Sequence, residues 1–168
     1  MLTILKKINN AICAILDTLM VILMSAMTIF IVAQVIYRYV LREPLSWSEE
    51  FSRYLFSGVT LFGAVLLYRS GGHINMSLLK DLVKIKTIQK LIDIAANILT
   101  LVFLCVVIRY GFPMSVQIFN LEVISPSMPW LNMGFVFFLL PVSAVFSLLA
   151  ALEVTLGSVL RLAAREEK

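Results

Sequence analysis

Residues 18–37 read TLMVILMSAMTIFIVAQVIY, a run of 20 residues without a charged side chain. An α-helix needs about 20 apolar residues to cross the hydrocarbon layer of a membrane, which is roughly 30 Å thick. In lipid the backbone polar groups of such a segment must be satisfied within it, which requires a helix. The run therefore predicts a membrane-spanning helix. Its length favours an uncleaved helix over the shorter apolar core of a signal peptide.

The composition of the whole chain agrees with a membrane protein. Of its 168 residues, 61% are hydrophobic and 14% are charged, whereas a soluble domain has about 45–50% apolar and about 25% charged residues. The net charge of +4 is small, and no Lys/Arg run with interleaved aromatic residues occurs, which argues against nucleic-acid binding. We expect an all-α integral membrane protein with a single domain over residues 1–168.

Four apolar stretches predict four transmembrane helices. We expect these helices at about residues 11–37, 51–68, 91–108 and 131–152. Pro126 and Pro129 precede the fourth stretch and resist a helix interior, so this helix is expected to begin near Trp130 or Asn132. Pro141 falls in its middle and is expected to kink it.

Lysine and arginine are distributed unequally between the two sides of this arrangement. Ten of them lie on the side shared by both termini and the middle connection, and four lie on the other side. The positive-inside rule therefore predicts that both termini are cytoplasmic. In the middle connection, Ser77–Ile85 places its apolar residues on one face, opposite Lys80 and Lys84. We expect a short amphipathic cytoplasmic segment there, on the membrane surface.

Residues for catalysis or metal binding are scarce. The single histidine is His73, and Cys13 and Cys105 form no CxxC pair, which argues against a zinc site or a bis-histidine haem site. No phosphate-binding or nucleophile-elbow glycine motif occurs. A thiol-redox enzyme is an alternative, but the predicted spans put the cysteines too far apart to bridge. We expect no enzyme activity and no cofactor in this chain.

The connection between the first two helices concentrates charge at the membrane surface. Ser46 and Glu49 fit a capping box at the start of the second helix, and Trp47 then lies at the depth that indole rings prefer. Glu49 and Glu50 precede Arg53 by four and three residues, so both carboxylates can reach its guanidinium. Ionisable groups within apolar spans usually face protein and are paired. We expect a partner interface, and its candidate residues are Arg38, Arg42, Trp47, Glu49, Glu50, Arg53 and His73.

Polar side chains within the predicted spans are too few to form a line across the membrane. A substrate or ion path needs more of them, often with broken helices at mid-membrane. We therefore expect an accessory subunit of a transporter. The alternatives are a self-sufficient small carrier and a four-helix accessory subunit of another membrane complex, such as a respiratory or export assembly.

One series of motifs resembles a known family. The series is Arg38-Tyr39, Trp47-Ser48-Glu49-Glu50, Arg53-Tyr54, Gly63, Arg69 and Gly72-His73-Ile74, with Pro129-Trp130 before the last helix. In this order the series resembles the small, Q-type membrane subunit of tripartite ATP-independent periplasmic (TRAP) transporters. One departure is Ser77, because such proteins often carry an aspartate at that place.

The resemblance implies a three-part system in the bacterial inner membrane. Similar subunits pair with a large multi-helix permease subunit, which holds the substrate and sodium sites, and with a periplasmic substrate-binding protein. Transport is sodium-driven symport of an organic acid, often a C4-dicarboxylate or a sialic acid. By this resemblance the small subunit braces the scaffold of the large subunit. From their place in the first outer loop, we expect Arg42 and Glu43 to meet the docking periplasmic protein.

Overall fold

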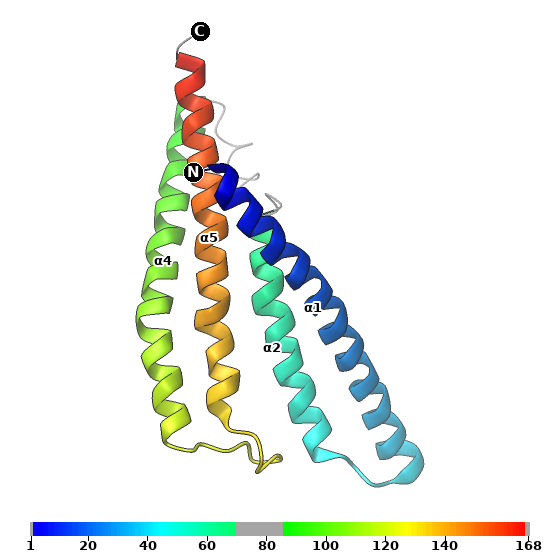
Figure 1. The fold of residues 1–168 in the computed structure, drawn as a ribbon. Coiled ribbons are helices and arrows are strands. Elements are labelled where there is room, and N and C mark those ends of the chain that lie inside the picture. The colour runs from blue at the N-terminus through cyan, green and yellow to red at the C-terminus, as the bar shows by residue number, and fades with distance from the viewer. Residues whose placement is uncertain (1, 70–85, 167–168) are drawn as a thin grey trace.

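Long helices account for most of the chain. The computed structural model describes residues 2–69 and 86–166. Its elements are α1 (Leu2–Ile36), a π-helix η1 (Tyr37–Leu41), α2 (Ser46–Arg69), α4 (Lys86–Asn120) and α5 (Met133–Glu166) (Figure 1). The described residues contain four segments long and apolar enough to cross a membrane, which are Lys6–Leu41, Ser46–Arg69, Ala95–Asn120 and Met133–Glu153. The prediction of four helices of spanning length is confirmed. The expected amphipathic segment at Ser77–Ile85 lies outside the described residues.

The helices are longer than the apolar stretches that predicted them. The largest difference is in α4, which continues past Ile108, through Arg109 and Pro113, to Asn120. A proline inside a membrane helix is tolerated because neighbouring groups compensate for the missing backbone hydrogen bond. The following helix, α5, likewise continues as an α-helix through Pro141.

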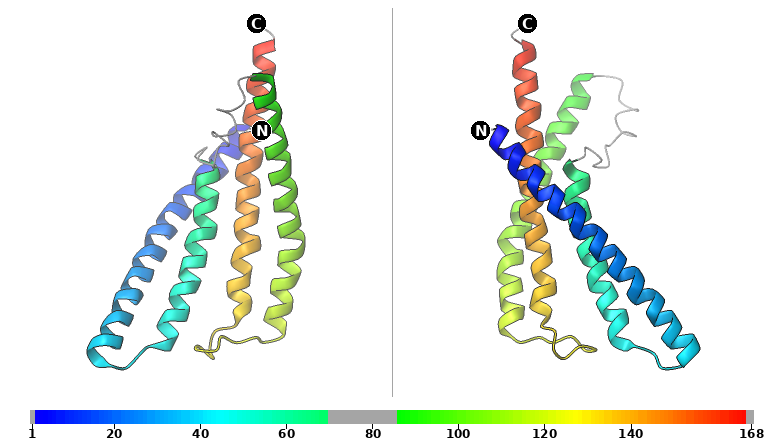
Figure 2. Two further views of the ribbon diagram at one scale, coloured as in Figure 1. Left: turned by 180° about the vertical axis from the view of Figure 1, so that it is seen from behind. Right: turned by 45° about the vertical axis from the view of Figure 1, so that its right-hand side comes forward.

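The helices form two hairpins, α1–α2 and α4–α5 (Figure 1). Both termini lie at one end of the bundle, which we call the terminal end. The α1–α2 connection (residues 42–45) and the α4–α5 connection (residues 121–132) lie at the opposite end, which we call the loop end. The two hairpins meet where α2 packs against α5, and α1 crosses α5 toward the terminal end. They diverge toward the loop end (Figure 2).

Glycines allow close packing between the helices. A Cβ atom at Gly58 would lie 3.3 Å from Cδ2 of Leu139 on α5, and a Cβ atom at Gly111 would lie 3.2 Å from Cβ of Pro141. Small residues at such positions bring helices into the van der Waals contact that holds them together in lipid. A buried apolar cluster completes the packing, and its members are Tyr68, Leu104, Ala144, Ala150 and Ala151.

The α4–α5 connection is ordered by its own hydrogen bonds. The amide of Ser125 donates to the carbonyl of Leu131 at 3.0 Å, and the amide of Met133 donates to the carbonyl of Val123 at 2.8 Å. Met128, which belongs to this connection, is fully buried. The connection is therefore a structured platform at the loop end.

Asn132 joins the end of α4 to the start of α5. Its Oδ1 accepts a hydrogen bond from the amide of Gly134 at 2.8 Å, and its Nδ2 donates to the carbonyl of Phe119 at 3.1 Å. The first bond caps α5, because an N-cap side chain satisfies an amide of the first turn. The second gives the Phe119 carbonyl, in the last turn of α4, a second donor beside the amide of Glu122, which lies at 3.1 Å.

Candidate functional site

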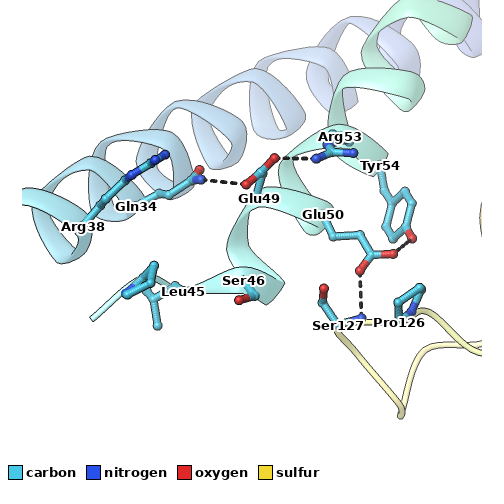
Figure 3. Close-up of a pocket in the computed structure, with 11 residues that line it drawn as sticks. Gln34, Arg38, Leu45, Ser46, Glu49, Glu50, Arg53, Tyr54, Pro126 and Ser127 are labelled. Atoms are coloured by element: carbon cyan, nitrogen blue, oxygen red, sulfur yellow. Dashed lines mark hydrogen bonds and ion pairs between the residues drawn. The ribbon is translucent and has the colours of Figure 1, made fainter. Parts of the chain in front are cut away.

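A charged cleft opens at the loop end, between the α1–α2 hairpin and the α4–α5 connection (Figure 3). Its volume is about 430 Å³. The residues that line it come from η1, α1, α2 and both connections, and they are Gln34, Arg38, Pro44, Leu45, Ser46, Glu49, Glu50, Arg53, Tyr54, Pro126 and Ser127. Four of the seven residues predicted for the interface therefore lie together, namely Arg38, Glu49, Glu50 and Arg53.

Glu49 and Arg53 form an ion pair one turn apart on α2. Both side chains are largely exposed, at 53% for Glu49 and 72% for Arg53. The other carboxylate oxygen of Glu49 lies 3.5 Å from Nε2 of Gln34 on α1. An exposed pair of this kind contributes little stability, so these charges are available to a neighbouring molecule. The predicted capping box is not seen among the described residues. Within them, the Ser46 side chain neither donates nor accepts a hydrogen bond in the first turn of α2, and the Glu49 carboxylate pairs with Arg53 instead of the backbone amide of Ser46.

Glu50 takes a different direction from Glu49 (Figure 3). Its carboxylate accepts hydrogen bonds from the hydroxyl of Tyr54 and, at 3.0 Å, from the amide of Ser127 in the α4–α5 connection. The Tyr54 hydroxyl also lies 3.1 Å from Sδ of Met133, at the start of α5. Of the two carboxylates within reach of Arg53, Glu49 is therefore its ion-pair partner. Glu50 joins one helix hairpin to the other.

The remaining predicted residues occupy the edge of the cleft or lie away from it. Arg38 is on the π-helix, where its guanidinium lies 5.9 Å from the centroid of the Tyr39 ring. Arg42 ends that π-helix in a left-handed conformation, with φ of 59°. Trp47 packs edge-on against Phe30, with ring centroids 5.8 Å apart, and is 40% exposed. His73 lies outside the described residues.

A second polar cluster, at the terminal end, was not predicted from the sequence. Arg69 on α2 donates from Nε to Glu153 on α5 at 3.2 Å, and from a terminal nitrogen to the carbonyl of Asn9 on α1 at 3.2 Å. The buried Nδ2 of Asn9 donates to Glu153 at 2.6 Å and to the carbonyl of Leu149 at 3.1 Å. Three helices thus share one network. The sequence held one signal for this cluster, which is the polar residue Asn9 within a long apolar helix.

The described residues offer no metal site. Among residues 2–69 and 86–166, no group of three or more histidine, cysteine, aspartate or glutamate side chains could hold an ion. Cys13 on α1 and Cys105 on α4 are free thiols. Two threonine hydroxyl groups within the spans bond to their own helices: Thr28 donates to the carbonyl of Met24, and Thr100 donates to the carbonyl of Ala96. The hydroxyl of Ser48 on α2 instead donates to the carbonyl of Phe30 on α1 at 3.2 Å.

Comparison with known proteins relates the chain to membrane transport. Residues 27–161 match the family model described as the DctQ component of tripartite ATP-independent periplasmic transporters. The chain is also similar to the sialic acid TRAP transporter small permease protein SiaQ of Vibrio cholerae. The two sequences are 27% identical over 150 residues, which cover 89% of this chain and 84% of the relative.

Proposed function

Since the chain belongs to the DctQ-component family of tripartite ATP-independent periplasmic transporters, we propose that it is the small membrane subunit of a sodium-driven symporter for organic acids. The family match over residues 27–161 carries this proposal. The substrate class is a sialic acid or a C4-dicarboxylate, and the name of the Vibrio cholerae relative favours the former. Sodium and substrate bind to the large permease subunit.

Within this system the chain acts as a brace. The hydroxyl groups of Thr28 and Thr100 are engaged within their own helices, so they do not offer ligands to a substrate. The two hairpins are joined at both ends, by Glu50 at the loop end and by Arg69 and Glu153 at the terminal end. Such a frame is suited to holding the scaffold of the large subunit in place.

The loop-end cleft is the contact site for partners. With both termini in the cytoplasm of the bacterial inner membrane, as the positive-inside rule predicts, this cleft faces the periplasm. The exposed Glu49–Arg53 pair and Arg38 then meet the large subunit. Arg42 and Glu43, both exposed, lie where a periplasmic substrate-binding protein docks.

Reconstitution tests the accessory role. In liposomes with a sodium gradient, we expect uptake of labelled sialic acid or C4-dicarboxylate by this chain together with the large subunit and the binding protein, and no uptake by this chain alone. Sodium-dependent uptake by this chain alone would refute the accessory role.

Charge reversal tests the contact site. Arg53→Glu places two like charges beside each other and should lower the amount of large subunit that co-purifies with the tagged chain. Lys6→Glu is the matched control, because Lys6 is an exposed cation near the terminal end and should leave co-purification unchanged. Equal yields from both variants would show that the cleft is not the contact site.

A further inference from the structure

Arg109 lies halfway along a membrane-spanning helix. Gly111 on α4 faces Pro141 on α5, and Phe119 faces Gly134, so the register of the two helices is fixed at two points. By this register Arg109 is level with Ser143. Each end of the α5 span, at Met133 and Glu153, is then about ten residues away, or about 15 Å at 1.5 Å per residue.

The helix beyond Arg109 has the surface of a membrane segment. Exposed apolar residues continue toward the loop end, with Met114 at 53% and Val116 at 44% exposed. Trp47 and Trp130 are exposed at the loop end itself, and tryptophan is enriched where a membrane meets water. The hydrocarbon layer is about 30 Å thick, so Arg109 lies near its middle.

No group of the described chain neutralises Arg109. Its side chain is exposed, and within residues 2–69 and 86–166 its interaction is with the ring of Tyr110, whose centroid lies 5.9 Å away. Pro113 also has no N–H to donate to the carbonyl of Arg109. An arginine at this depth is costly in lipid, and ionisable groups there face protein and are paired.

A polar stripe extends from Arg109 toward the loop end. Gln117 and Asn120 follow it on the same face of α4, because residues at intervals of three and four lie above one another on a helix. A shallow groove of about 610 Å³ runs along this face, and its lining is Phe112, Pro113, Val116, Gln117, Asn120 and Leu121. This face offers hydrogen-bonding groups that lipid tails cannot satisfy.

We propose that this face of α4 binds a transmembrane helix of the large partner subunit, and that this helix places a carboxylate opposite Arg109 at mid-membrane. Charge complementarity selects the occupant, since Arg109 requires an anion and the hydrocarbon offers none. The inference rests on the proposed function, which supplies a large membrane partner. It assigns a second contact surface, on a different hairpin from the Glu49–Arg53 pair.

Co-purification tests the role of the charge. The tagged chain is co-expressed with the large subunit, and the large subunit recovered per tagged chain is measured. We expect at least a ten-fold loss for Arg109→Leu, a smaller loss for Arg109→Lys, and no loss for Met114→Leu, an exposed residue on a different side of α4 from Arg109. Arg109→Leu is also expressed alone, and an unchanged monodisperse yield shows that the variant folds.

Cross-linking identifies the occupant. A photo-reactive amino acid at Val116, on the proposed face, should form an adduct with the large subunit, whereas the same group at exposed Met114, on the opposite side, should not. Adducts with a second copy of this chain, or wild-type recovery of the large subunit by Arg109→Leu, would overturn the proposal. The wild-type complex could form and transport while Arg109→Leu recovers the large subunit normally and Val116 forms no adduct with it. The proposed function would then stand and this contact surface would be refuted. If the wild-type chain recovers no large subunit, the proposed function fails first.

Discussion

Replacing Gly134 with alanine probes the tightest contact between α4 and α5. A Cβ atom at this position would lie 2.6 Å from Cβ and 2.8 Å from Cα of Phe119, whereas non-bonded carbon atoms pack at about 3.5–4.0 Å. Because one of these atoms is backbone, the two helices must separate by about 1 Å to admit the methyl group. Overpacking costs about 1–3 kcal/mol, and replacing a helical glycine returns about 0.5–1 kcal/mol. The net loss is about 1–2 kcal/mol.

Thermal unfolding of the purified chain in detergent measures this loss. At about 2–4 °C per kcal/mol for a chain of this size, Gly134→Ala should lower Tm by about 2–8 °C. Gly63→Ala is the matched control. There the new Cβ would lie 3.2 Å from Cε of Met20, the flexible end of a side chain that can move away. Its Tm should stay the same or rise slightly. Equal Tm values for the two variants would refute the reasoning, because the register of α4 and α5 would then not depend on this contact.

Two further predictions concern the terminal-end cluster and the topology. Arg69→Met should lower the free energy of unfolding by about 1–3 kcal/mol, because it removes a charged donor from the carboxylate of Glu153, whose side chain is 13% exposed. The double variant Arg69→Met with Glu153→Leu should recover part of this loss in the same thermal assay; strictly additive losses would contradict an interaction between the two side chains. In a background with Cys13→Ser and Cys105→Ser, a membrane-impermeant maleimide should label Glu43→Cys but not Lys7→Cys in intact cells. The reverse labelling pattern would contradict the orientation expected from the positive-inside rule.

Hydropathy predicted the number of helices because a long charge-free run has one solution in lipid. It did not predict the end of α4. In the sequence alone, a charged residue at Arg109 followed by a proline at Pro113 resembles the end of a membrane helix. In the structure α4 continues because Gly111 packs against Pro141 and Phe119 against Gly134, and such contacts between helices have no local signal in the sequence.

The spacing of the cleft residues predicted their proximity but not their pairing. Spacings of three and four residues allow both carboxylates to reach Arg53. The direction that Glu50 takes depends on the amide of Ser127, which is 77 residues away in the sequence. The terminal-end cluster was missed for the same reason, since Asn9 and Glu153 are 144 residues apart.

The attachment of the two hairpins at both ends of α2 fixes their relative rotation. Glu50 and Arg69 are separated by about 29 Å along the helix axis at 1.5 Å per residue. Hydrogen bonds tolerate a variation of about 0.5 Å in length. Over a lever arm of this length, a change of this size at one attachment corresponds to a tilt of about 1°. A partner that touches both hairpins therefore meets two surfaces at a nearly constant angle, and a load applied to one hairpin is transmitted to the other as torque.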